Sequence, residues 1–252
     1  MIAIVTTYFD RPHQLRQTLL TIERSKVKDK FVVVVDDCSS LKPEIPEVNF
    51  PVHVIRTKNK SWTNPEPAYN AGIFYALDKC DVMVIQNAEC YHAGDVLTYA
   101  KNNITDENYI SFGCFSIDKE TTFKDHNIHE IVNKTGASHD GQIAWYNHPI
   151  YRPVGYDFCT AISKKNMIRL NGFDERLSEG CGYGDDYLLY RIKLMGLSVE
   201  ITESPFVVHQ WHYDCPVPEN KAALVKENRW LFELLKKEKT VKAVRFYENI
   251  TD

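Results

Sequence analysis

The sequence predicts an α/β fold in which helices cover both faces of a mostly parallel central sheet. Short runs rich in Val and Ile, at residues 2–5, 31–35 and 82–85, each stop abruptly at polar residues. Buried parallel strands have this pattern at their carboxyl ends. Helical patterns lie between the runs, and alternation of strands with helices is typical of a parallel sheet with helices on both faces.

The first half of the chain supplies the most regular elements. Asp10 is the expected N-cap of the first helix, Pro12 lies in its first turn, and apolar residues recur at helical spacing over residues 15–22. A further strand is expected at residues 52–56. A second helix is expected from about residue 65 to residue 78.

The second half is less regular. Residues 118–138 are polar and charged, so we expect a loop with one short helix there. The sequence has no internal repeat and no low-complexity linker, so we expect a single domain over residues 1–252. The other expected elements are strands at residues 109–117, 158–163 and 198–202, and helices at residues 164–170, 185–195 and 219–237.

Composition excludes several classes of protein. A net charge of −4 and a pI near 6.1 argue against a general nucleic-acid-binding protein, which usually carries a net basic face. No apolar run approaches the roughly 18 residues that span a bilayer, and residues 1–5 do not resemble a signal peptide. We therefore expect a soluble, cytoplasmic protein. The seven cysteines, Cys215 among them, are scattered without a Cys-x-x-Cys pair, so we expect neither disulfides nor a zinc site.

Polar side chains end three of the predicted strands. Each cluster alone would read as an ordinary turn, because Asp and Ser bond their own backbone. In an open α/β sheet, however, ligands bind beyond the carboxyl ends of the strands, so three such clusters at one edge indicate a ligand site. The clusters are Thr6-Thr7, Asp36-Asp37 and residues 86–89.

The sequence lacks both common glycine-rich phosphate loops. Neither Gly-x-Gly-x-x-Gly nor Gly-x-x-x-x-Gly-Lys-Ser/Thr follows the first strand, which disfavours dinucleotide dehydrogenases and P-loop enzymes. A phosphate site without such a loop usually needs a divalent cation held by carboxylates. Asn87 and Glu89, two residues apart at a strand end, should point to one side and offer oxygen ligands suited to Mg²⁺ or Mn²⁺.

Six segments, in this order, resemble glycosyltransferase family 2 on the nucleotide-sugar-binding GT-A fold over residues 1–213. The resemblance implies an inverting enzyme that moves a sugar from a UDP- or GDP-linked donor to a hydroxyl of a glycan or glycosylated acceptor. It implies that residues 1–110 bind the nucleotide-sugar, that residues 111–215 bind the acceptor and catalyse transfer, and that residues 216–252 are a C-terminal helical extension. The segments are IAIVTTYFDRPHQLRQTL, VVVVDDCSS, NPEPAYNAGI, VMVIQNAEC, GFDERLSEGCGYGDDYLLYRIKLMG and VVHQWH.

The resemblance implies roles for residues at the first two strand ends. Thr6 and Thr7 would flank the nucleotide. Asp36, followed by Asp37, would accept a hydrogen bond from the base, since a carboxylate can bind the N–H of a uracil or guanine ring.

The segment at residues 64–72 resembles the family stretch in which an Arg-Asn pair opens a helix beneath the donor. Asn70 matches the Asn of that pair and is expected to contact the donor, whereas Tyr69 stands in the place of the Arg. A basic contact to the diphosphate must therefore come from elsewhere in the chain. The candidates are Arg11, Arg56 and Lys58.

Asn87-Ala88-Glu89 falls where the family carries Asp-x-Asp, so the resemblance implies a metal site for Mn²⁺ or Mg²⁺ there. Because Asn87 is a neutral ligand, Glu89 is the main protein ligand and the donor phosphates would complete the coordination. A His after a late strand can supply another ligand. His209 fits this position better than His212, because it directly follows an apolar run.

The general base is expected in the Gly-rich turn that precedes the helix at residues 185–195. Inversion needs a carboxylate to accept the proton of the acceptor hydroxyl, and a helix N-terminus stabilises such a charge. Spacing to Arg191 and Gly196 aligns Asp185 with the family base, whereas alignment on Leu189 favours Asp186.

Aromatic residues in the middle of the chain are candidates for acceptor binding, because their rings can stack on the apolar faces of sugars. Two other functions remain open. One is a non-catalytic nucleotide- or carbohydrate-binding module on the same fold. The other is a sugar nucleotidyltransferase, although such enzymes normally have a Gly-rich basic loop after the first strand. The aromatic candidates are Trp145, Tyr146, His148, Tyr151 and Trp211.

Overall fold

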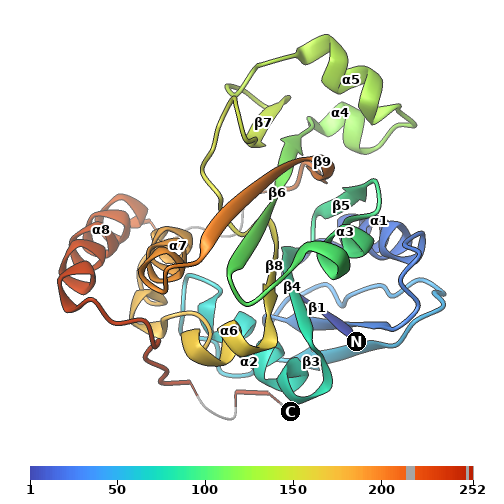
Figure 1. Cartoon of the computed structure of the whole chain (residues 1–252). Helices are drawn as coiled ribbons and strands as arrows, with labels where there is room; N and C mark the ends of the chain where they lie inside the picture. Colours follow the sequence, from blue (N-terminus) through green and yellow to red (C-terminus); the bar gives the residue numbers. More distant parts are fainter. Residues whose placement is uncertain (214–218, 248–249, 252) are drawn as a thin grey trace.

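The computed structural model describes residues 1–213, 219–247 and 250–251 (Figure 1). Its nine strands form a sheet in the order β3-β2-β1-β4-β8-β6-β9-β5, and β7 pairs with β6. The strands are β1 (Ile2–Tyr8), β2 (Lys30–Asp36), β3 (Val52–Arg56), β4 (Val82–Asn87), β5 (Cys90–Ala93), β6 (Asn108–Ser116), β7 (Ala144–Asn147), β8 (Cys159–Ser163) and β9 (Ser198–His209).

The helices alternate with the strands in the first half of the chain, as predicted. The two longest connections after residue 110 also contain helices. The helices are α1 (Pro12–Glu23), α2 (Glu66–Ala76), α3 (Val96–Asn103), α4 (Lys119–Thr122), α5 (Ile128–Thr135), α6 (Lys164–Leu170), α7 (Gly184–Leu194) and α8 (Lys221–Glu238), with 3₁₀ turns η1 (Leu77–Lys79) and η2 (Glu175–Leu177).

The α/β fold class is confirmed, and the sheet has a parallel part and a mixed part. β1 runs parallel to β2 and β4, and β3 runs parallel to β2. The other part begins at β8, which is antiparallel to both β4 and β6, while β6 is parallel to β9.

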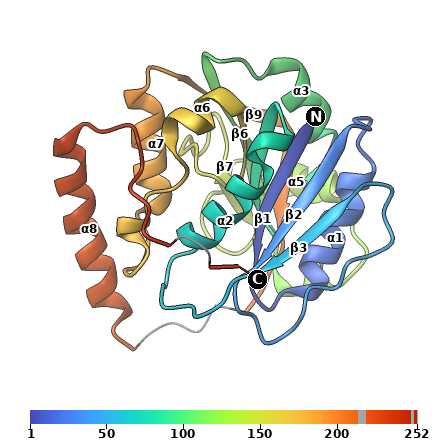
Figure 2. The same ribbon diagram turned by 90° about the horizontal axis from the view of Figure 1, so that it is seen from below.

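Alternation along β1 divides the apolar core between two faces of the sheet (Figure 2). Ile2 and Ile4 pack with residues of α1 and α3, whereas Ala3 and Val5 pack with residues of α2, α6 and α7. Helix α2 lies unusually close to the sheet at Gly72, where a Cβ would be 2.6 Å from Val5 Cγ1. This close approach brings the N-terminal turn of α2 to the strand ends.

Several local predictions were wrong or incomplete. Asp10 does not cap α1, because Arg11 is the N-cap residue and Asp10 Oδ1 instead accepts a hydrogen bond from Leu41 N at 2.6 Å. Residues 118–138 contain two short helices, α4 and α5, rather than one. The short strands β5 and β7 were not predicted, since four residues carry too little periodicity.

The six cysteines in the described part of the chain are free, as expected, and Cys215 lies outside it. Over the same residues, no helix is long and apolar enough to cross a membrane.

Candidate active site

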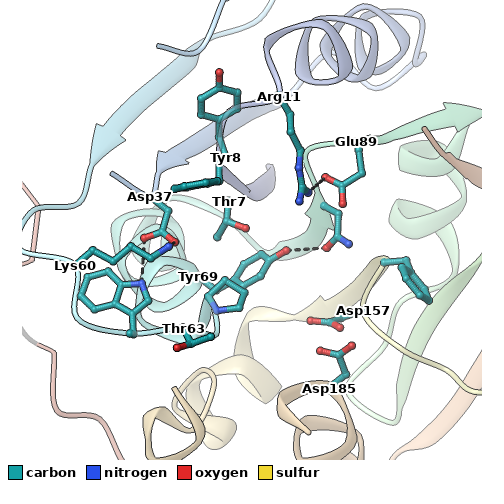
Figure 3. A pocket seen from close by; sticks show the side chains of 15 residues that line it. Thr7, Tyr8, Arg11, Asp37, Lys60, Thr63, Tyr69, Glu89, Asp157 and Asp185 are labelled. Atoms are coloured by element: carbon teal, nitrogen blue, oxygen red, sulfur yellow. Dashed lines mark hydrogen bonds and ion pairs between the residues drawn. The ribbon is translucent and has the colours of Figure 1, made fainter. Parts of the chain in front are cut away.

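A cavity of about 440 Å³ opens at the carboxyl ends of β1, β2 and β4 (Figure 3). In the register of these strands, Tyr8 pairs with Asp36 and Thr7 pairs with Asn87. The three polar strand ends therefore meet at one edge of the sheet, which is where an open α/β fold binds its ligand.

The first two strand ends contribute Thr7 and Asp37 to the cavity wall, but not the neighbours Thr6 and Asp36. Thr6 is buried. Asp36 is also buried, and its carboxylate accepts hydrogen bonds from Ser39 N at 3.0 Å and Arg56 Nη1 at 2.6 Å. Those bonds fix the loop after β2. Asp36 therefore does not line the cavity, although the sequence led us to expect that it binds the nucleoside base there.

Asp37 is held in place by three donors from the segment after β3. Its Oδ1 accepts from Trp62 Nε1 at 3.0 Å and from Thr57 Oγ1 at 3.2 Å, and its Oδ2 lies 2.5 Å from Lys60 Nζ. Each carboxylate oxygen can accept two hydrogen bonds. Oδ2 can therefore accept a further one from a ligand.

Tyr69 and Asn87 are bonded to each other at the cavity wall, whereas Asn70 points elsewhere. Burial raises the pKa of Tyr69 well above its ordinary value, so the protonated phenol donates to Asn87 Oδ1 at 2.9 Å. Asn70 is buried, donates to Glu175 Oε1 at 2.8 Å and accepts from Phe173 N at 2.7 Å. Asn70 therefore joins α2 to the loop before η2 and does not line the cavity.

Of the described residues, two with cationic side chains line the cavity, Arg11 and Lys60. Arg11 was a sequence candidate, and its Nη1 lies 2.7 Å from Glu89 Oε2. Lys60 was not predicted, although it stands in the basic stretch that also contains the candidate Lys58. Arg56, the third candidate, pairs with Asp36.

Glu89, His209 and His212 form a cluster whose ligand atoms all lie within 4.8 Å of one another. Glu89 Oε1 is 3.4 Å from His209 Nε2 and 3.6 Å from His212 Nε2. Burial alone would raise the pKa of Glu89, but the charge of Arg11 and a hydrogen bond from His209 hold it well below its usual range. Burial lowers the pKa of His212, which favours the neutral imidazole that binds metals. His212 therefore joins the expected pair Glu89 and His209.

A pair of carboxyls, Asp157 and Asp185, faces the cavity from its opposite side (Figure 3). Figure 3 shows the two carboxyls side by side, and burial raises the pKa of both, so the pair readily retains one shared proton. Burial, and then the charge of Asp185, raise the pKa of Asp157 well above its usual range. Asp185 is exposed to solvent, whereas Asp157 is buried. Asp157 is therefore the better holder of the shared proton, and Asp185 is left as the ionised carboxylate.

Asp186, the alternative candidate for the base, is engaged differently. Its Oδ1 accepts a hydrogen bond from Tyr156 Oη at 2.7 Å, and it does not line the cavity. Asp157 was missed by the sequence analysis. The only signal for it was an acid directly before the apolar run of β8.

A third carboxyl, Glu66, lies directly behind the pair. Its side chain reaches the N-terminus of α7, where a Cβ on Gly184 would be 2.1 Å from Glu66 Oε1. Burial, and then the charge of Asp185, raise the pKa of Glu66 to about 8. Glu66 Oε2 is buried and has no hydrogen-bond partner among the residues that the structure describes, and Glu66 borders a cavity of about 80 Å³ together with Asp157 and Asp185.

A second cavity, of about 430 Å³, is lined by the two histidines of the Glu89 cluster. Tyr146 and Trp211, both sequence candidates for the acceptor, line it together with His209, His212 and Tyr213. The Glu89 cluster thus contributes Glu89 to the polar cavity and its two histidines to the aromatic one.

The other three acceptor candidates of the sequence do not line this cavity, and Tyr151 stacks on His148 with ring centroids 4.2 Å apart. Trp145 is buried and packs edge-on against Phe115, with ring centroids 5.1 Å apart. His148 is buried too, and its Nδ1 accepts from the backbone of Tyr151 at 3.2 Å. Trp145 borders a different groove, beside Glu203.

Comparison with known proteins gives a family match over most of the sheet. The model of the family described as glycosyl transferase family 2 matches residues 3–169. No curated protein has a sequence that matches this chain significantly.

Several solved glycosyltransferases share the fold at low identity. S. aureus TarS 1–349 in complex with UDP has a TM-score of 0.63 and 11% identity over 94% of this chain and 64% of its own. The Pyrobaculum calidifontis mannosyltransferase PcManGT, in complex with GDP-Man and Mn²⁺, has a TM-score of 0.52 and 15% identity over 94% of this chain and 63% of its own.

The catalytic domain of Drosophila beta1,4galactosyltransferase 7, in complex with xylobiose, has a TM-score of 0.53 and 14% identity over 89% of this chain and 79% of its own. These likenesses confirm the GT-A fold. The chain spans less than two thirds of the length of the solved TarS and mannosyltransferase chains.

Proposed function

The chain belongs to glycosyl transferase family 2, and we propose on this basis that it transfers a sugar from a UDP- or GDP-sugar to a hydroxyl of a glycan or glycosylated acceptor, with inversion. One observation carries the proposal. One cavity is lined by four residues suited to these roles. Asp37 is suited to bind the nucleoside base and Arg11 to bind the diphosphate. Glu89 belongs to the cluster suited to a metal, and Asp185 is suited to act as the catalytic carboxylate.

In this proposal the donor lies across the strand ends. Asp37 accepts an N–H of the nucleoside base, because its Oδ2 has a free acceptor position, and Thr7 flanks the nucleotide. Arg11 and Lys60 supply the positive charge for the diphosphate, because Tyr69, which stands in the place of the family Arg, cannot supply it.

The Glu89 cluster fits a divalent cation that would contact the donor phosphates. One carboxylate oxygen and two imidazole nitrogens suit Mn²⁺ better than Mg²⁺, which prefers oxygen ligands only. A bound cation would stabilise the negative charge of the departing diphosphate.

The hydroxyl of the acceptor attacks the anomeric carbon of the donor sugar next to Asp185. The acceptor oxygen forms a bond to the anomeric carbon, the bond from that carbon to the diphosphate oxygen breaks, and its electron pair leaves with the diphosphate. Asp185 accepts the hydroxyl proton. Asp157 already holds the proton shared by the pair, so it keeps Asp185 oriented without competing for the new one.

A nucleoside diphosphate should stabilise the fold more with Mn²⁺ than with EDTA. When the free nucleotide concentration is a hundred times the dissociation constant, binding should increase the free energy of unfolding by about 2.7 kcal/mol. Thermal unfolding with UDP and with GDP would detect this increase. His212→Ala should remove the Mn²⁺-dependent part, whereas His139→Ala, a change to an exposed histidine, should not. Equal shifts with Mn²⁺ and with EDTA in the parent protein would contradict the metal proposal.

The aromatic cavity is proposed to bind the acceptor. Trp211→Ala should raise the acceptor KM about fivefold, because ring stacking contributes about 1 kcal/mol. The value of kcat and the affinity for the nucleotide should change little. Trp230→Ala, on the exposed face of α8, is the matched control. Steady-state kinetics with an acceptor panel provides the measurement, and an unchanged KM in the Trp211 variant would remove this cavity from acceptor binding.

A further inference from the structure

The chain after α8 returns across the molecule to the donor side of the cavity. Figure 2 shows it leaving the far end of α8 and ending beside β1–β3. We call residues 240–247 the strap. Its backbone is bonded along the way, since Ala243 N donates to Leu170 O at 2.8 Å and Glu175 N donates to Val244 O at 2.9 Å.

Glu175 fixes the last part of the strap to the body of the protein. Its buried carboxylate accepts from the backbone N–H groups of Phe246 and Tyr247, the latter at 2.8 Å, and from Asn70 Nδ2 on α2 at 2.8 Å. One carboxylate thus holds both α2 and the strap, so the position of Tyr247 is defined relative to the cavity.

The ring of Tyr247 packs against a residue of the cavity wall. Its centroid lies 5.1 Å from that of Trp62, with the planes at 65°. Trp62 lines the cavity, is itself buried, and donates its Nε1–H to Asp37 Oδ1 at 3.0 Å. The contacts therefore run from the strap through Trp62 to Asp37.

The chain beyond the strap reaches the same carboxylate by a second route. Thr251 forms an antiparallel bridge with Thr57, and Ile250 O accepts from Lys58 N at 2.7 Å. The hydroxyl of Thr57 donates to Asp37 Oδ1 at 3.2 Å. Two donors to Asp37, from Thr57 and Trp62, are thus supported by the C-terminal segment.

We propose that the strap completes the nucleoside end of the donor site, and that Tyr247 is a positioning residue that orients Trp62 and, through it, Asp37. The proposal rests on the proposed function, because it assumes that a nucleoside diphosphate occupies the cavity. Without the ring of Tyr247, the indole of Trp62 loses the surface that sets its orientation, and its hydrogen bond to Asp37 becomes less well aligned.

Titration calorimetry of Tyr247→Ala with UDP and GDP, in the presence of Mn²⁺, tests the proposal. We expect about a tenfold weaker Kd for the nucleotide that binds the parent protein, a loss typical of one well-placed contact. Phe246→Ala is the matched control, because Phe246 is the exposed neighbour on the same strap, 62% accessible. Tyr247→Phe keeps the ring and should bind like the parent protein.

Pyrophosphate with Mn²⁺ separates positioning from general damage. It occupies only the diphosphate end of the site, so its affinity should be the same in Tyr247→Ala and in the parent. An equal loss for pyrophosphate and for nucleotide, or equal nucleotide affinity in the two Ala variants, would overturn the inference. If the parent protein binds neither nucleotide, the proposed function fails and the inference fails with it.

Discussion

Asp185→Asn should lower the rate of sugar transfer by at least ~10²-fold, the usual consequence of losing a general base. The amide keeps the shape of the carboxylate but cannot accept the proton of the acceptor hydroxyl. Nucleoside diphosphate affinity should stay within about twofold, because the role of Asp185 is at the acceptor hydroxyl. Transfer assays and calorimetry on the same preparation measure both quantities.

Asp186→Asn is the matched control for this variant. Asp186 lies next in the chain, in the same helical turn, and an Asn oxygen can still accept the hydrogen bond from Tyr156. It should therefore lose only a small part of the activity. If the two variants lose activity equally, or if Asp185→Asn remains active, then Asp185 is not the base. A parent protein that binds nucleotide tightly and transfers no sugar would support the alternative of a binding module.

Asp157→Asn makes the same mechanism testable from the other side of the pair. In our reading Asp157 holds the shared proton and is neutral, so the neutral amide should replace it with most of the activity retained. A loss as large as that of Asp185→Asn would instead indicate that Asp157 accepts the proton, and the roles within the pair would be reversed.

The sequence predicted the parallel part of the sheet and the edge at which the cavity lies, because both follow from local patterns. Runs of β-branched residues mark β1, β2 and β4, and parallel strands end at the same edge. Which of two adjacent residues faces the ligand was harder to predict. Asp36 is the last residue of β2 and Asp37 is the next, so a small change in the path of the chain decides which one lines the cavity.

The catalytic side of the cavity depends on pairings that no local pattern reveals. Asp157 reaches Asp185 because β8 runs antiparallel to β4, with Cys159 opposite Gln86. His212 joins Glu89 although it lies three residues beyond the end of β9, so the apolar run favoured His209 alone. Trp145 is another residue whose position depends on strand pairing. Its aromatic ring suited a sugar, but its strand, β7, pairs with β6 and places the ring in the core.

Glu66→Gln should make the protein more stable than the parent at neutral pH, by an amount that increases with pH. Burial raises the pKa of Glu66 to about 8 in the folded state, from an ordinary value of 4.5. Between these values the folded protein retains a proton that the unfolded chain releases, so the parent loses stability as the pH rises from about 4.5 to about 8. Gln has no proton to lose, and its oxygen can still accept from Asn64 Nδ2.

The difference in the free energy of unfolding between Glu66→Gln and the parent should grow by up to about 1.4 kcal/mol per pH unit in this window, reaching about 3 kcal/mol at pH 7. Urea denaturation at pH 5, 6, 7 and 8 measures it, and effects of other titrating groups cancel in the difference. Glu179→Gln, the same change at an exposed position, is the matched control. If the free energy of unfolding of Glu66→Gln varies with pH in the same way as that of the parent, then Glu66 is ionised in the folded protein. The cavity would then hold an additional negative charge behind Asp185, and a rise in the proton affinity of that base would have to be part of the mechanism.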